Sequence, residues 1–128
     1  MADVESSFRT FVLQDVAVLA EVGERFYWNK VADKPTLPFV RGTTVTDKPN
    51  YTQDGDGTGI TTIQLDVFHE SKSECNRVAG LIKTRCSGYR GAMGDYYVRM
   101  FLRNIPSNWD ESGRLFRRIV EVEVGYVT

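Results

Sequence analysis

Hydrophobic residues recur at three- and four-residue intervals along the first part of the chain, which is the spacing of one face of a helix. The recurring positions are Val4, Phe8, Phe11, Val12, Val16, Leu19 and Ala20. Asp3 is placed to cap the start of this segment and Gly23 to end it, while Gln14-Asp15 predicts a short break. We therefore expect helical structure from Asp3 to Val22, interrupted once.

A second helix is predicted from Ser71 to Gly88. Ser71 and Glu74 have the spacing of a capping box, in which each residue satisfies a backbone group of the other. A narrow apolar stripe follows, consisting of Cys75, Val78, Ala79, Ile82 and Cys86. Such a stripe predicts a helix that packs on one side and faces water on the other.

Strands are expected where apolar and polar residues alternate. The alternating segments are 39–46, 60–69, 95–105 and 116–126, and a short extended piece is expected at 25–28. A long hairpin loop, 47–59, is rich in Gly, Asp, Asn and Pro and joins the first two strands. A turn at 88–94 and a polar connection at 106–113 complete the order of elements.

This order predicts an α+β fold with an antiparallel or mixed sheet of about four to five strands and two helices packed on one face. The chain is expected to be a single domain, 1–128. The second sheet face would then be uncovered by helices. It carries Phe68, Phe101, Ile105, Ile119, Arg99, Arg103 and Arg117. A mixed aromatic and charged surface of this kind suits a protein partner.

Charge narrows the possible partners. The chain has 16 basic and 17 acidic side chains among its 128 residues, so it lacks a sequence-wide electrostatic footprint for nucleic acid or anionic membrane. No apolar stretch approaches the ~20 residues that a bilayer crossing needs, and the N-terminus does not have the pattern of a secretory signal. We expect a cytosolic protein whose DNA contacts, if any, are local.

Candidate catalytic chemistry is sparse. Cys75 and Cys86 lie eleven residues apart in one predicted helix, roughly 16 Å along its axis. A disulfide needs Cα atoms within about 7 Å, so both thiols are expected to be reduced. Two cysteines and the single His69 are too few for the four ligands of a structural zinc site. No nucleophile elbow, P-loop or dinucleotide fingerprint is present in the sequence. We expect no catalytic residues, no metal and no cofactor.

Two polar segments remain as candidate contact sites. Asp54-Gly55-Asp56-Gly57 resembles the front of a calcium loop but lacks the distal Glu, which favours a solvated hairpin tip. The arginines Arg114, Arg117 and Arg118, with Arg99 and Arg103, are the best candidates for phosphate binding. Glu121 and Glu123 on the same strand favour cross-strand pairing or salt bridges between subunits instead.

With these elements placed, the chain resembles the tail-completion family of long-tailed bacteriophages, also called tail terminator or tail-to-head joining proteins. The resemblance extends over nearly the whole chain. It is carried by Val22-Gly23-Glu24-Arg25-Phe26-Tyr27, Leu37-Pro38-Phe39-Val40, Tyr51-Thr52 with the Gly-rich loop, Ile63-Gln64-Leu65-Asp66-Val67-Phe68, Tyr89-Arg90-Gly91 and Gly113-Arg114-Leu115-Phe116-Arg117-Arg118. None of these is a catalytic signature, so their order and spacing carry the resemblance.

The resemblance implies a structural virion protein, not an enzyme. It implies a homo-oligomeric, hexameric ring that caps the head-proximal end of the tail tube, stops tail elongation and contacts both the tube protein and the head connector or stopper protein. Genomic DNA would pass through the lumen without specific binding, as the near-neutral charge allows. The candidate interface or lumen residues are Tyr51, Asp54, Asp56, Arg99, Arg103, Trp109, Arg114, Arg117 and Arg118.

Two alternatives stay open at this stage. The chain could be another head-tail connector or tail tube component with the same small α+β design. It could instead be a small-molecule-binding domain with a pocket between sheet and helices, although its titratable residues are not clustered in sequence.

Overall fold

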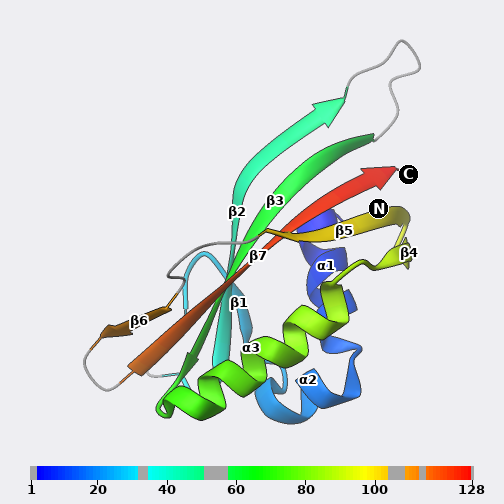
Figure 1. Ribbon diagram of the computed structural model, residues 1–128. Coiled ribbons are helices and arrows are strands. Elements are labelled where there is room, and N and C mark those ends of the chain that lie inside the picture. The colour runs from blue at the N-terminus through cyan, green and yellow to red at the C-terminus, as the bar shows by residue number, and fades with distance from the viewer. Residues whose placement is uncertain (1–2, 32–34, 51–57, 104–108, 113–114, 128) are drawn as a thin grey trace.

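The computed structural model describes residues 3–31, 35–50, 58–103, 109–112 and 115–127, with the backbone alone at 49–50 and 109–112. These residues form three helices and seven strands (Figure 1). The helices are α1 (Val4–Leu13), α2 (Val16–Val22) and α3 (Lys72–Cys86). The strands are β1 (Phe26–Trp28), β2 (Phe39–Asn50), β3 (Thr58–His69), β4 (Arg90–Met93), β5 (Tyr96–Arg103), β6 (Trp109–Ser112) and β7 (Leu115–Val127).

The N-terminal helical segment is broken at Asp15, as the sequence predicts. The Asp3 carboxylate caps α1 by accepting from the Ser6 backbone N–H at 2.7 Å. The Asp15 carboxylate caps α2 by accepting from the backbone N–H groups of Ala17 and Val18. Each helix thus starts on an aspartate that satisfies backbone donors which have no partner within the helix.

The predicted stripe of α3 is confirmed, because its five residues are the ones that this helix buries. The Ser71 hydroxyl accepts from the Glu74 backbone N–H at 3.4 Å. The Glu74 carboxylate does not complete the capping box, because it pairs with Arg77 one turn further on. The same guanidinium bonds to Glu21 at 2.7 Å and so connects α3 to α2.

The sheet has the strand order β1-β2-β3-β7-β5-β4, and β6 also pairs with β7. It is mixed, since β1 runs parallel to β2 while the other pairs are antiparallel. The expectation of four to five strands and two helices is therefore corrected to seven strands and three helices. β4 lies in the segment predicted as a turn, 88–94, and β6 in the segment predicted as a connection, 106–113. The sequence did not predict these two strands, because four residues are too few to show an alternating pattern.

The first hairpin is longer than its sequence predicts. β2 runs to Asn50 and β3 begins at Thr58, so both strands enter the predicted loop 47–59. Their register continues through Lys48 opposite Ile60, after an irregularity between Thr44 and Thr46. β1 pairs only with the start of β2, so this part of β2 forms an edge of the sheet with β3 on one side and no described strand on the other. An edge strand tolerates charged residues and proline, here Pro49.

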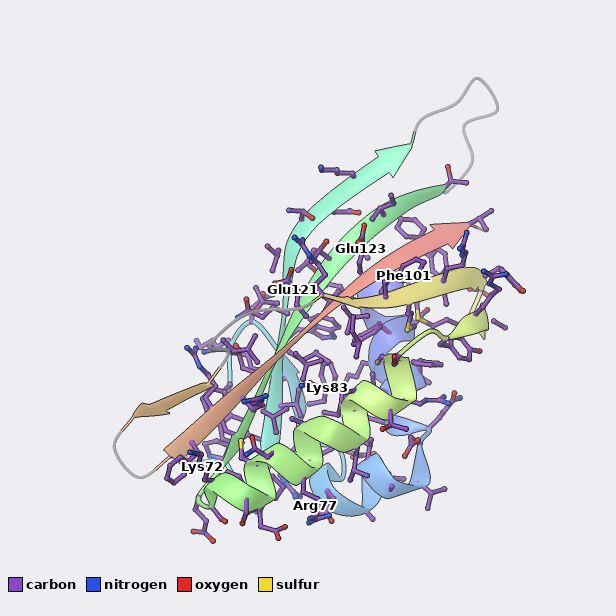
Figure 2. All side chains as sticks on the ribbon, in the orientation of Figure 1. Lys72, Arg77, Lys83, Phe101, Glu121 and Glu123 are labelled. Carbon is purple, nitrogen blue, oxygen red and sulfur yellow. The ribbon has the colours of Figure 1, made fainter. Side chains whose placement is uncertain are left out.

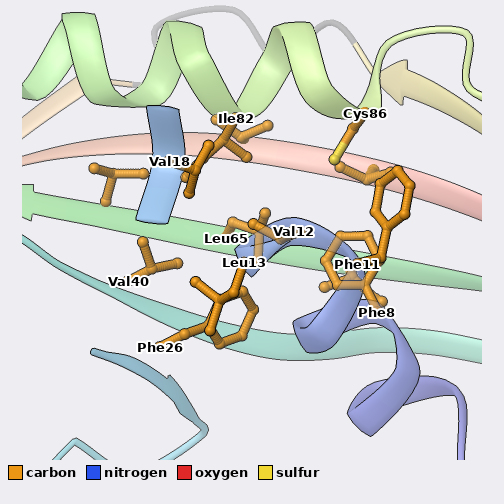
Figure 3. Close-up of a cluster of buried hydrophobic side chains, with 14 of the residues drawn as sticks. Phe8, Phe11, Val12, Leu13, Val18, Phe26, Val40, Leu65, Ile82 and Cys86 are labelled. Carbon is orange, nitrogen blue, oxygen red and sulfur yellow. The ribbon is translucent and has the colours of Figure 1, made fainter. Parts of the chain in front are cut away.

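The helices all pack on one face of the sheet, as predicted. Figure 3 shows residues of all three helices, among them Phe8, Val18 and Ile82, meeting Val40 and Leu65 of the sheet. The buried hydrophobic side chains form one cluster, which also includes Val120, Val122 and Val124 of β7, Val98 and Met100 of β5, and both cysteines. The core therefore lies between the helices and one face of β2, β3, β7 and β5.

Candidate assembly interface

The other face of the sheet has no described helix packed on it (Figure 1). Cross-strand partners point to the same side of a sheet, so the register identifies the residues of this face. They include Arg41, Asp66 and Ile119 in one row and Gln64, Glu121 and Arg103 in the next. We call this surface the open face. The odd-numbered residues of β5 and β7 are on it, as the alternation predicts.

Aromatic rings and a buried ion pair occupy the end of the open face near β1. The Phe39 and Phe68 rings stack at 4.8 Å between centroids, and Tyr27 meets Phe39 edge-on at 6.3 Å. Arg41 lies over the Phe68 ring and donates to Asp66 with 2.9 Å between Nη2 and Oδ2. The stacked rings and the paired charges therefore hold one another in place at this end of the face.

A groove crosses the opposite end of the open face. Its floor is the row Lys48, Ile60, Gly125 and Arg99, which are successive cross-strand partners on β2, β3, β7 and β5. Gly125 leaves this row without a side chain at its centre. Tyr97 and Val127 complete an apolar lining around a volume of about 410 Å³. The groove therefore has an apolar middle between two cationic ends.

Between the aromatic end of the open face and the groove, β5 and β7 carry a strip of charged and aromatic side chains. Arg103 pairs with Glu121 at 3.2 Å, which confirms cross-strand pairing for this arginine. Phe101 is opposite Glu123 and half exposed, with the Arg99 guanidinium 5.5 Å from its ring centroid. Figure 2 shows Phe101, Glu121 and Glu123 on this strip, whereas Lys72, Arg77 and Lys83 lie along α3.

The structure separates the arginines that the sequence grouped as one basic run. Arg99, Arg103 and Arg117 share the open face. However, Arg117 lies on β7 and Arg99 is opposite Gly125, eight residues further along β7, which separates these two arginines by roughly 26 Å. Arg118 points to the helix-covered face. There burial and, to a lesser extent, the Arg118 charge lower the pKa of Lys83. A single phosphate-binding patch of all these arginines is therefore not formed.

Several predicted interface residues stay predictions. Tyr51, Asp54, Asp56 and Arg114 lie outside the described residues, as does Ile105 of the predicted sheet face. Trp109 is placed as a backbone position of β6, opposite Arg118. Sequence reasoning missed the groove, because it assigned Lys48 to a loop. The available signal was Gly125, a glycine within a strand of β-branched residues.

The described part of the chain includes candidate metal ligands and both thiols. It contains no group of three or more His, Cys, Asp or Glu side chains that could hold a metal. His69 accepts a hydrogen bond at Nδ1 from the Glu70 backbone N–H. Both cysteines are free and buried, as predicted. None of the described helices is both long and apolar enough to cross a bilayer.

Comparison with solved structures shows the fold. A chain from the virion of a native gene transfer agent particle aligns with a TM-score of 0.65 at 10% identity, and the alignment covers 100% of both chains. A second solved chain aligns with a TM-score of 0.65 at 11% identity over 99% of this chain and 98% of the other. No curated protein sequence matches significantly.

The family comparison covers almost the whole chain. The family described as tail completion protein gp17 matches residues 8–126, from α1 to the last strand. This range contains every described residue of the open face and of the groove except Val127. The chain therefore belongs to the tail completion protein gp17 family and has a structural role in a phage tail.

Proposed function

We propose that this chain forms a hexameric ring on the head-proximal end of the tail tube, stops elongation of the tube and joins the tail to the head connector. It acts without catalysis and without a cofactor. The observation that carries the proposal is the family match over residues 8–126. One chain of the same fold comes from the virion of a gene transfer agent, which also supports a place in an assembled particle.

The open face supports a role in assembly. It presents a half-exposed Phe101, partly paired charges and a groove, which together give the mixture of apolar and polar groups found in protein interfaces. The ion pair and aromatic stack at the other end stiffen the sheet, and a stiff surface loses little entropy when it docks.

Passage of DNA through the ring is consistent with the charge of the chain. A formal charge of -1 means that the subunits as a whole do not attract phosphates. We place the Asp54 and Asp56 segment at the lumen or at a neighbouring subunit. The double variant Asp54→Lys with Asp56→Lys should fold and should impair assembly or DNA passage, whereas normal yields of infectious particles would remove these residues from the function.

Tube elongation in vitro tests the proposal. Purified chain is added to tail tubes that are growing from their tube protein, and tube lengths are measured by electron microscopy. A terminator limits length at amounts far below that of the tube protein. Unchanged lengths, or incorporation of the chain along the tube, would instead indicate a connector or tube component.

The groove also raises the alternative of small-molecule binding, because its volume lies in the range of ligand sites. Its described lining is mainly apolar and contains no His, Cys, Asp or Glu residue, which favours a protein side chain as its occupant. A thermal-shift screen with metabolites and metal ions tests this alternative, and a large increase in melting temperature would support it.

A further inference from the structure

Six of the seven large hydrophobic side chains that are exposed in the described structure lie at two separate places. On α2 they are Val16, which is 82% exposed, and Leu19. On the open face they are Ile60, Tyr97, Phe101 and Val127, which line or adjoin the groove. Val45 is exposed apart from both groups. Exposed apolar side chains concentrated in this way indicate contact surfaces.

The outer side of α2 is unusual for a helix that faces solvent. Its sequence VAVLAEV contains one charged residue, Glu21. Val18 and Val22 point into the core, while Val16, Ala17, Leu19 and Ala20 are all exposed. A surface helix normally places polar residues on its outer side. This helix therefore presents a narrow apolar ridge, which we call the α2 ridge.

The groove has free space at its centre. Its central residue is Gly125, and a Cβ built there would meet its nearest heavy atom, the Arg99 carbonyl oxygen, only at 3.8 Å. The centre of the groove is therefore open to an incoming side chain. Ile60, which is 46% exposed, stands beside this centre.

Charge also distinguishes the two surfaces. The ridge is flanked by the carboxylates of Asp15 and Glu24, with the Glu21 carboxylate already paired to Arg77, whereas the groove has Lys48 and Arg99 at its ends. A contact between the ridges of two subunits would bring carboxylates together, and a contact between their grooves would bring cations together. Ridge on groove places opposite charges at the border of an apolar contact, which favours this pairing.

We propose that the α2 ridge of one subunit inserts into the Gly125 groove of the next copy of this chain. Figure 1 places α2 at one end of the molecule and the chain end of β7, where the groove lies, at the other. A contact between two different surfaces is heterologous, and repeating it closes a ring when the rotation is suitable. The inference rests on the proposed ring and names the surfaces that hold it together.

Cysteine crosslinking tests the contact. Chains carrying Leu19→Cys and chains carrying Ile60→Cys are given different tags, made together in cells that assemble the particle, and oxidised with copper phenanthroline. The native thiols do not interfere, since Cys75 and Cys86 are fully buried. We expect a disulfide-linked dimer that contains both tags.

Each single variant made alone is the matched control. A chain with both substitutions should give a ladder of linked oligomers, whereas each single variant should remain monomeric on a non-reducing gel. Dimers from Leu19→Cys alone would indicate an isologous contact through α2 and overturn the proposal. Absence of mixed dimers from particles that contain both chains would overturn it as well.

Filling the groove separates this contact from the proposed function. Gly125→Leu should remain folded by circular dichroism but lose the oligomer and fail to limit tube length, while Val45→Glu, outside both surfaces, should behave as wild type. Normal capping by Gly125→Leu would reject the ridge-and-groove contact and leave the terminator function intact. Failure of the wild-type chain to limit tube length would reject the function itself.

Discussion

Arg41 and Asp66 form an ion pair across β2 and β3, with 2.9 Å between Nη2 and Oδ2, on the face of the sheet that carries no described helix. The Asp66 carboxylate is fully buried and also accepts from the Gln64 amide at 3.1 Å. The Arg41 side chain is one-third exposed and lies over Phe68. This pair therefore places a buried carboxylate on a face that no described helix covers.

Removing the carboxylate of this pair should weaken the fold measurably. Asp66→Ala leaves Arg41 and Gln64 without their acceptor, but the exposed part of Arg41 can be rehydrated, so we expect a loss of about 2 kcal/mol in the free energy of unfolding. Urea denaturation measures this loss. Arg103→Ala is the control, because the Arg103 side chain is largely exposed and such pairs contribute at most about 1 kcal/mol. Equal losses in the two variants would contradict the argument.

Gly80 offers a stabilising substitution within α3. A Cβ built there meets nothing within 4 Å, and glycine inside a helix costs up to about 1 kcal/mol relative to alanine. We expect Gly80→Ala to raise the free energy of unfolding by that order, as measured by urea denaturation. A stabilised variant that no longer limits tube length would show that this side of α3 contacts another subunit or partner. No gain in stability would contradict the expected propensity effect.

Asp15 should link the stability of α2 to assembly. Asp15→Ala removes the acceptor for the Ala17 and Val18 backbone N–H groups, a loss of about 1 kcal/mol, whereas Asp15→Asn keeps a capping oxygen. Because the α2 ridge exists only while α2 is helical, the alanine variant should also oligomerise less. Thermal unfolding and size-exclusion chromatography measure the two effects. Equal behaviour of the two variants would contradict a capping role.

The two thiols should be unreactive in the native protein. Burial raises the pKa of Cys86 to about 12 and also raises the pKa of Cys75, so both stay protonated at pH 8 and out of contact with reagents. Ellman's reagent at pH 8 should detect no thiol in the native chain and both thiols after denaturation. Rapid reaction of the native protein would show that α3 opens from the sheet.

Local patterns in the sequence predicted which residues of α1, α3, β3 and β7 face the core. The prediction was wrong for α2, where Val16, Leu19 and Ala20 are exposed and Val18 and Val22 are buried. The stripe of α3 was predicted residue by residue, and the alternation predicted over 116–126 matches the buried Val120, Val122 and Val124 of β7. These predictions succeed because the geometry of a helix or strand fixes the direction of each side chain, and burial then selects apolar residues for one side. The break at Asp15 follows equally from local capping chemistry.

Tertiary structure alone decided which strands are neighbours. β7 pairs with β3 on one side and with β5 and β6 on the other, and these partners come from distant parts of the chain. That register brings Lys48, Ile60, Gly125 and Arg99 into one row and creates the groove, and it also separates Arg99 from Arg117. Periodicity gives the face of a residue but not its neighbour across the sheet, because register depends on pairing over long sequence separations. The sequence by itself therefore determined the long elements and most of their buried faces, whereas the short strands β4 and β6 and the groove exist only in the folded sheet.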